Sequence, residues 1–143
     1  MPLLFVYGTL KHGFPNAHVN AGICRPGRFR TCSPMPMYLL GDGHVPCVVH
    51  APGQGHQVHG ELYEVDASAL VAMDKLERIG DDANGYLRLE IDVEAVDDLA
   101  AGALTAFIYT KPPERIPPDE PRIGPLPEYT QQHTARFRWT GID

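Results

Sequence analysis

One carboxylate in this chain stands where it could do acid–base chemistry. The stretch from Ala67 to about Ile79 has the apolar period of a helix, and its core-facing members are Ala69, Leu70, Ala72, Met73 and Leu76. Glu77 follows Met73 by one turn, so it projects along the same apolar side. A carboxylate there is costly unless it has a cationic partner or faces a cavity. Desolvation raises the pKa of such a carboxyl, which suits a general acid or base working near neutral pH.

The same position also has a structural interpretation, which the residues alone leave open. Glu77 could reach solvent from the edge of the helix, or it could pair with an arginine such as Arg88. The helix is expected to start after Asp66 as its N-cap and to stop at Gly80. The polar residues expected on its opposite, solvent-facing side are Asp74, Lys75 and Arg78.

A second stretch that could bind a ligand lies near the start of the chain. The apolar run Leu3–Val6 predicts a buried strand that continues into Tyr7 and breaks at Gly8. Gly8 allows either a positive φ or the close approach of another group. After such a strand, the backbone N–H groups of Gly8, Thr9 and Leu10 can face one spot and bind an anion or an oxyanion. An ordinary turn is the alternative interpretation.

Other residues with reactive side chains are weaker candidates. Four histidines could be imagined as a metal site: His44, His50, His56 and His59. However, the spacing of His56 and His59 in a predicted strand points their rings to opposite faces, so no metal site is predicted. Cys47 lacks an evident histidine partner and is interpreted as a packing residue. Lys11 and His12 could attract an anionic substrate, although a solvated turn is the favoured interpretation.

Many short strands are expected to position these residues. The predicted strands are Arg28–Cys32, Met37–Leu40, Val45–His50, Gln57–Val65, Tyr86–Val93 and Leu104–Thr110, and a weak helix is predicted at Ala17–Ile23. Pro46 suggests that its strand lies at an edge or that the strand starts there. Tyr86 and Tyr109, from strands near the helix, are candidates either for lining a pocket or for ordinary core or rim positions. One strong helix among many short strands predicts an α+β fold with a closed or nearly closed sheet.

Composition bounds the class of protein. A length of 143 residues fits one domain, residues 1–143. Seven of the 14 prolines fall between Pro112 and Pro127, so residues 111–143 are expected to form a proline-rich C-terminal wrap over the surface of this domain. The net charge of −6 argues against nucleic acid as a partner. No apolar run approaches the length of a membrane span, and no basic segment precedes Leu3–Val6 as in a signal peptide. Three cysteines without a C-x-x-C pair fit reduced thiols in the cytoplasm.

Taken in order, several stretches resemble the gamma-glutamyl cyclotransferase-like family over about residues 1–110. They are Tyr7-Gly8-Thr9-Leu10-Lys11, Val45-Pro46-Cys47-Val48-Val49-His50-Ala51-Pro52-Gly53, Gly60-Glu61-Leu62-Tyr63-Glu64-Val65, Met73-Asp74-Lys75-Leu76-Glu77 and Tyr86-Leu87-Arg88. The resemblance implies a small mixed β-barrel flanked by short helices. It also implies that Glu77 is the catalytic acid/base and that the loop Tyr7–Leu10 binds the substrate.

The activity implied by this resemblance is the cyclisation of a gamma-glutamyl amide to 5-oxoproline with release of a free amine. The nucleophile is the substrate's own α-amino group, so no cofactor and no metal are expected. The expected partner is a small gamma-glutamyl molecule, with no nucleic acid or membrane, and the chain is expected to be a monomer or weak homodimer. Three alternatives stay open: the same cyclisation on gamma-glutamyl amino acids, on a gamma-glutamyl-acylated biosynthetic intermediate, or a binding module without turnover.

Overall fold

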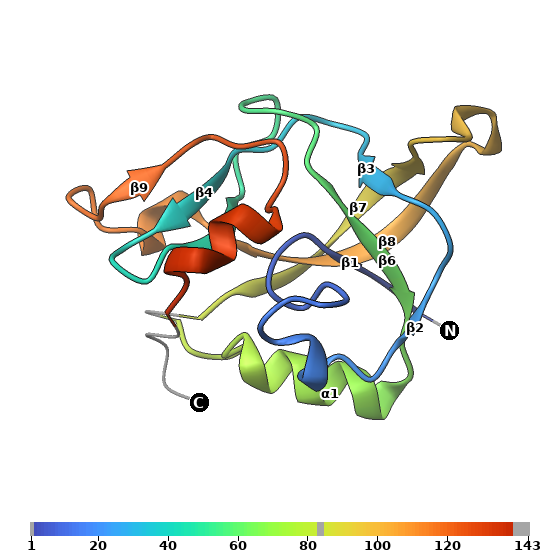
Figure 1. The fold of residues 1–143 in the computed structure, drawn as a ribbon, viewed down its shortest axis with the longest axis horizontal. Helices are drawn as coiled ribbons and strands as arrows, with labels where there is room; N and C mark the ends of the chain where they lie inside the picture. The colour runs from blue at the N-terminus through green and yellow to red at the C-terminus, as the bar shows by residue number, and fades with distance from the viewer. Residues whose placement is uncertain (1, 83–84, 139–143) are drawn as a thin grey trace.

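A small closed β-barrel forms the centre of the protein. The structure, a computed structural model, describes residues 2–82 and 85–138, and within them five strands close into a barrel in the order β1, β6, β3, β7 and β8 (Figure 1). Their bounds are β1 Leu3–Val6, β6 His59–Glu64, β3 Phe29–Thr31, β7 Leu87–Ala95 and β8 Ala103–Lys111. The ring closes because β1 pairs antiparallel with β6 and parallel with β8, where Leu4 lies opposite Phe107. This confirms the predicted α+β fold with a closed sheet, and the strand bounds agree with the predicted ones to within about two residues.

Further strands extend the barrel from the edge of β8. β5 (Val45–Val49) pairs parallel with β8 at Thr110 and Lys111, followed by β4 (Met37–Leu40) and β9 (Arg122–Ile123). β2 (Ile23–Cys24) adds to β6. The same edge of β8 therefore serves β1 at Phe107 and β5 from Thr110 onward. We call the place where β1 and β5 part along β8 the fork.

Pro46 lies at the start of its strand, the second of the two alternatives predicted for it, and β5 is not an edge strand. β5 lies between β4 and β8, with Pro46 opposite Leu39 of β4. Pairing with β8 begins only at Val48, so the side of β5 that faces the fork is unpaired at Pro46. Proline is tolerated there because that backbone position has no ladder partner to lose on the β8 side.

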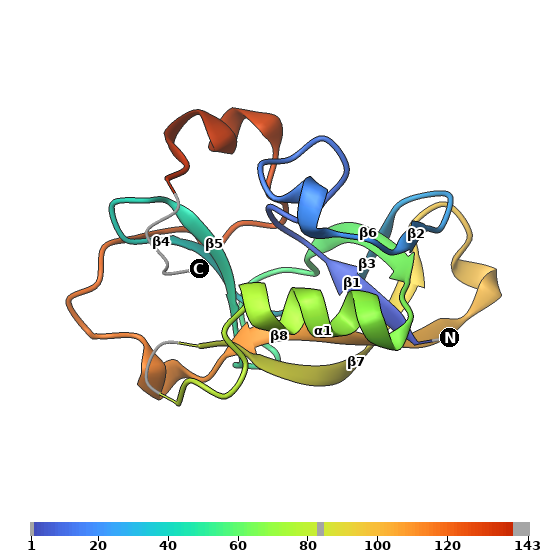
Figure 2. The ribbon, with the colours of Figure 1, turned by 90° about the horizontal axis from the view of Figure 1, so that it is seen from below.

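The helix α1 (Ala67–Leu76) lies across the barrel beside β1 (Figure 2). Asp66 caps its start as predicted, since its side chain accepts a hydrogen bond from the Ala69 N–H at 2.7 Å. The helix ends earlier than predicted: Glu77 is the C-cap, and Arg78 takes the left-handed conformation, with φ of 59°, that was expected of Gly80. Glu77 therefore sits at the very end of the helix.

Buried side chains gather on both sides of the barrel wall, following the period of two along each strand. From β1, Leu4 and Val6 pack against Ala69 and Met73 of α1. Phe5 points the other way, into the barrel interior, where the fully buried Tyr129 also lies. The strand thus separates a helix-side core from a barrel-interior core.

The connecting segments contain short 3₁₀ turns. These are η1 Ala17–Val19, η2 Leu99–Ala101, η3 Pro113–Arg115 and η4 Gln131–Arg136. The predicted helix over Ala17–Ile23 is wrong, because only one 3₁₀ turn forms and Ile23 belongs to β2. The last of these turns, η4, lies within the segment 111–143 that was predicted to form a C-terminal wrap, and residues 139–143 of that segment lie outside the described residues.

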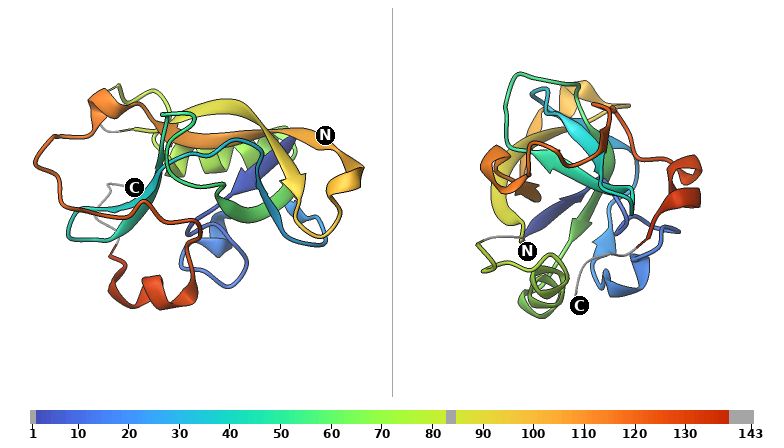
Figure 3. Two further views of the ribbon diagram at one scale, coloured as in Figure 1. Left: turned by 90° about the horizontal axis from the view of Figure 1, so that it is seen from above. Right: turned by 90° about the vertical axis from the view of Figure 1, so that its left-hand side faces the viewer.

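The segment after β8 runs back along the molecule toward the loop that follows β1 (Figure 3). Gln131 of η4 donates a hydrogen bond to the Gly13 carbonyl at 3.0 Å. The Lys11 ammonium donates to the Tyr129 carbonyl, and Lys11 is only 5% exposed, so the expectation of a solvated turn at Lys11 is wrong. In the part of the chain that the structure describes, no helix is long and apolar enough to cross a membrane.

Candidate active site

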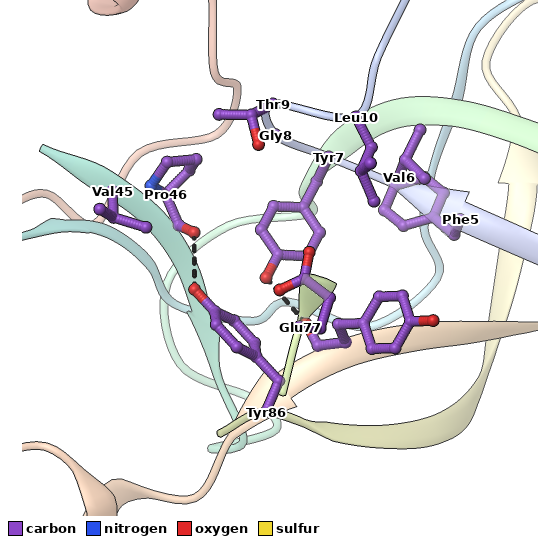
Figure 4. A pocket seen from close by; sticks show the side chains of 11 residues that line it. Phe5, Val6, Tyr7, Gly8, Thr9, Leu10, Val45, Pro46, Glu77 and Tyr86 are labelled. Atoms are coloured by element: carbon purple, nitrogen blue, oxygen red, sulfur yellow. Dashed lines mark hydrogen bonds between the residues drawn. The ribbon is translucent and has the colours of Figure 1, made fainter. Parts of the chain in front are cut away.

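A cavity opens at the fork, between the end of β1, the start of β5 and the end of α1 (Figure 4). The residues that line it are Phe5, Val6, Tyr7, Gly8, Thr9, Leu10, Val45, Pro46, Glu77, Tyr86 and Tyr109. All of the site residues predicted from the sequence are in this set. The cavity has a volume of about 30 Å³, and the empty space including its open mouth is about 420 Å³. The cavity is therefore narrow, and most of the space around it is open to solvent.

The loop after β1 lines this cavity with Gly8, Thr9 and Leu10. Its carbonyl groups are all engaged elsewhere: Gly8 accepts from the Lys11 N–H at 3.1 Å, Thr9 from the Asn16 N–H at 2.8 Å, and Leu10 from an Asn20 side chain at 3.0 Å. The N–H groups of Gly8, Thr9 and Leu10 have no hydrogen-bond acceptor among the described residues. Three uncommitted donors in a row, in residues that line a cavity, suit an anion or an oxyanion.

Asn16 braces the loop from outside the cavity. Its side-chain amide donates to the Thr9 hydroxyl at 2.9 Å, and its N–H donates to the Thr9 carbonyl. Asn16 directly precedes the short turn Ala17–Val19, but its side chain makes no cap bond to that turn. The asparagine holds the binding loop instead.

Glycine is required at position 8 by close approach and not by a positive φ. A β-carbon there would lie 2.8 Å from Cγ of Pro46 and 3.3 Å from its Cβ. Both atoms belong to a rigid ring in β5, which cannot turn aside as a flexible side chain would. The contact between Gly8 and Pro46 sets the spacing between the loop and the opposite wall of the cavity.

The hydroxyl of Tyr7 bridges the two strands at the fork. It donates to the Tyr109 carbonyl of β8 at 2.7 Å and accepts from the Val48 N–H of β5 at 3.1 Å. Burial raises the pKa of Tyr7 well above its ordinary value, so the phenol is neutral. With both hydrogen-bonding roles used inside the protein, the Tyr7 hydroxyl supports the cavity, and its ring forms part of the lining.

Glu77 directs its carboxyl into the space between Tyr7 and Tyr86 (Figure 4). It is half-buried, and burial raises its pKa from 4.5 to about 7, an effect partly offset by the positive charge of Lys111. Its place at the C-terminus of α1 acts in the same direction as burial, because the helix dipole disfavours a negative charge there. A carboxyl with this pKa can both accept and release a proton near neutral pH.

Two tyrosines complete the wall around Glu77, which agrees with one of the two interpretations of these residues. The Tyr86 hydroxyl donates to the Pro46 carbonyl at 3.1 Å. The Tyr109 hydroxyl donates to the Asp74 carboxylate at 2.6 Å. Both hydroxyls are engaged in the protein, and burial raises the pKa of each tyrosine.

Asp74 does not face solvent, contrary to the expectation from helix periodicity. Its carboxylate accepts from Tyr109 and forms an ion pair with Arg88 of β7. This pair also removes the structural interpretation of Glu77 as the partner of Arg88. Helix periodicity correctly places Asp74 away from the apolar side of α1. It does not show that long side chains from β7 and β8 reach around the edge of the helix to contact Asp74.

Lys111, whose positive charge lowers the pKa of Glu77, was not among the candidate residues from the sequence. Strand alternation was an available signal, since Lys111 follows Tyr109 by two positions in β8 and so shares its face. Cys47 is fully buried and its pKa is raised by burial to about 12, so it is a neutral packing residue as interpreted. Among the described residues, no group of three or more His, Cys, Asp or Glu side chains lies together so as to hold a metal ion.

Comparisons with known proteins show the family of the chain. A family model described as gamma-glutamyl cyclotransferase, AIG2-like, matches residues 4–130. Gamma-glutamylaminecyclotransferase of Bos taurus is 36% identical over 143 residues, covering 95% of this chain and 80% of the bovine protein. The Homo sapiens protein of the same name is 36% identical over 132 residues, covering 80% and 83%. The crystal structure of an aig2-like protein from Mus musculus matches with a TM-score of 0.80 and 29% identity, covering 100% of this chain and 97% of that one. The chain therefore belongs to the gamma-glutamyl cyclotransferase, AIG2-like family.

Proposed function

We propose that the protein cyclises a gamma-glutamyl amide of an amine to 5-oxoproline and releases the amine, with Glu77 as general acid and base. The observation that carries the proposal is that one cavity is lined both by a carboxyl with a pKa of about 7 and by three residues whose backbone N–H groups are uncommitted. The first supplies proton transfer and the second supplies stabilisation of negative charge, which are the two needs of this reaction.

The proposed reaction begins with the substrate's α-ammonium group. Glu77 as a carboxylate takes a proton from it, and the freed amine attacks the γ-carbonyl carbon of the same molecule. The new C–N bond closes a five-membered ring, and negative charge develops on the carbonyl oxygen. The N–H groups of Gly8, Thr9 and Leu10 are proposed to hold this oxyanion or the substrate's α-carboxylate.

Breakdown of the tetrahedral intermediate then releases the amine. The original amide C–N bond breaks as Glu77, now protonated, gives its proton to the leaving nitrogen. In all, two protons pass from the attacking nitrogen to the leaving nitrogen, and a single carboxyl with a pKa near 7 can carry them in turn. The ring product is 5-oxoproline, and the carboxylate is regenerated.

The cavity lining favours an amine over an amino acid as the leaving group. None of the described residues that line the cavity is a lysine or arginine, and Val45 and Pro46 add apolar surface. A gamma-glutamyl amino acid would bring a second carboxylate into this lining, where it would be desolvated without a partner. The names of the bovine and human relatives agree with an amine. The free thiols of Cys24, Cys32 and Cys47 support a cytoplasmic setting for the reaction.

The experiment is a panel of gamma-glutamyl alkylamides and gamma-glutamyl amino acids, with 5-oxoproline and free amine measured by mass spectrometry. We expect equal amounts of the two products from the alkylamides and much less from the amino acids. The matched control is an N-acetylated gamma-glutamyl alkylamide, which has no free amine and should give neither product. Release of glutamate, or no turnover of any panel member, would contradict the proposal. Faster turnover of the amino acids would keep the cyclisation and overturn the assigned leaving group.

A further inference from the structure

Lys111 lies at the end of β8 with its side chain directed toward the candidate site. Its backbone is fixed, since it pairs with Val49 of β5 and its carbonyl accepts from the His50 N–H at 2.9 Å. Its ammonium nitrogen lies 5.0 Å from the centre of the Tyr86 ring, within the range of a cation–π contact. Tyr86 lines the cavity together with Glu77, and Lys111 is not itself a lining residue, so this cation lies next to the cavity wall.

The ion pairs around the end of α1 leave two opposite charges without a direct partner. Three arginines near the site are paired with carboxylates: Arg88 with Asp74, Arg78 with Asp81, and Arg115 with Asp82. Among the described residues, neither Lys111 nor Glu77 forms an ion pair within 4.0 Å. The positive charge of Lys111 is therefore not neutralised by any other described carboxylate in contact.

The other titratable groups that face Glu77 carry no charge near neutral pH. They are Tyr7 from the end of β1, Cys47 from β5, Tyr86 before β7 and Tyr109 from β8, and burial raises the pKa of each. Asp74, one turn earlier on α1, is committed to Arg88 and Tyr109. Lys111 is thus the cation whose field acts on the Glu77 carboxylate.

We infer that Lys111 is a positioning residue for Glu77: its ammonium group, seated over the Tyr86 ring, stabilises the ionised carboxylate and keeps the base ready in the free protein. The inference rests on the proposed role of Glu77 as base. A carboxyl in this cavity loses solvation when it ionises, and an opposite charge nearby restores part of that loss. Lys111 acts through the charge of Glu77 and needs no contact with the substrate.

The test measures the charge of Glu77 directly. Protein labelled with carbon-13 at the glutamate δ-carbon is titrated by NMR, and the Glu77 signal is assigned by its absence in Glu77→Gln. Lys111→Met should raise the Glu77 midpoint by about 0.5 to 1 pH unit, as expected for loss of a nearby opposite charge. Lys111→Arg should restore the wild-type midpoint. Lys75→Met removes the same charge from an exposed position on α1 and should leave the midpoint unchanged.

The pH profile of 5-oxoproline formation provides the second readout. In Lys111→Met the acid limb of kcat/KM should move to higher pH by the same amount, so that the deficit is about threefold to tenfold at pH 6.5 and shrinks above pH 8. A role confined to packing would lower kcat/KM equally at every pH. If Lys111→Met does not fold, Lys111→Gln removes the same charge from a polar side chain. A Glu77 midpoint that is the same in Lys111→Met and Lys75→Met would overturn this inference, whereas a wild-type protein that forms no 5-oxoproline would contradict the proposed function instead.

Discussion

The amide N–H of Tyr86 donates a hydrogen bond to the carbonyl oxygen of Glu77 across 3.0 Å. The two residues that flank the 78–85 loop therefore lie side by side. This contact holds the Glu77 carboxyl and the Tyr86 ring, which both line the cavity, next to each other. Arg115 of η3 secures the same loop by donating to the Gly85 carbonyl at 2.9 Å. Both site residues are thus held together where the chain leaves α1 and where it enters β7.

The hydroxyl of Tyr7 should be needed for stability at the fork. Tyr7→Phe leaves the Val48 N–H and the Tyr109 carbonyl without their buried partner. We expect the free energy of unfolding to fall by about 1–3 kcal/mol, measured by urea denaturation. The Val48 amide should also exchange faster with deuterium. Tyr38→Phe is the control, because the Tyr38 hydroxyl has no hydrogen-bond partner among the described residues. Equal stability of the two variants would contradict the bridging role.

Gly8→Ala should lower activity through its collision with Pro46. The new β-carbon would lie 2.8 Å from Cγ of the proline ring, so the loop must move away from β5. We expect kcat/KM for 5-oxoproline formation to drop at least about tenfold, since misplacement of binding groups by about 1 Å has large effects on rate. Thr9→Ser, in the same loop, should change it little.

A double variant identifies the cause of that loss. Pro46→Ala removes the Cγ atom that the new β-carbon meets, so the pair Gly8→Ala and Pro46→Ala should recover part of the activity lost in Gly8→Ala alone. No recovery in the double variant, with both proteins folded by circular dichroism, would show that the contact does not set the loop position.

Asp74→Asn should destabilise the end of α1. The substitution removes the charge that pairs with Arg88 and weakens the bond from Tyr109, both in a half-buried site. We expect a loss of about 1–3 kcal/mol in the free energy of unfolding by urea denaturation. Asp97→Asn breaks an exposed pair with Arg28 and should cost about 0–1 kcal/mol. If the two losses are the same, Asp74 does not anchor the helix.

The sequence could predict those features of the site that follow from local helix and strand geometry. Helix periodicity placed Glu77 on the protein-facing side, and the strand period in β1 separated Val6 from Phe5, because both follow from local geometry. Periodicity gives a direction but does not name the neighbour in that direction. Asp74 was expected in solvent for this reason, although side chains from β7 and β8 reach it.

Long-range packing decided the remaining positions. Lys11 is buried because the segment around Tyr129 returns across the loop from 118 residues away in the chain. The fork depends on β8 sharing one edge between β1 and β5, a pairing pattern that no stretch of sequence specifies locally. Pro46 indicated an unpaired backbone position, as expected of proline, but not that the unpaired side would face Gly8.

The raised pKa of Glu77 predicts how stability depends on pH. Its pKa is about 7 in the folded protein, above the ordinary value of 4.5. The stabilising contribution is therefore complete below pH 4.5 and is lost as pH rises through 7, because the unfolded chain releases this proton first. The difference of 7 − 4.5 corresponds to a loss of up to about 3 kcal/mol.

Comparison with Glu77→Gln isolates this contribution. Relative to the wild type, Glu77→Gln should gain up to about 3 kcal/mol in the free energy of unfolding between pH 4.5 and pH 8, by urea denaturation at each pH. Glu114→Gln, the same substitution at an exposed position, should run parallel to the wild type. A difference between wild type and Glu77→Gln that does not change with pH would mean that the carboxyl is solvated in the folded protein.

The most direct test of the account is the turnover number of Glu77→Gln. Glutamine keeps the shape of the side chain but cannot take up and return a proton, so kcat for 5-oxoproline formation should fall by about 10² to 10⁴, as is typical for loss of a positioned acid or base. KM should stay within about threefold, because the N–H groups of Gly8, Thr9 and Leu10 remain, and Glu114→Gln should match the wild type in both constants. A Glu77→Gln protein that retains near wild-type kcat would contradict the account, since the carboxyl would then have no part in proton transfer.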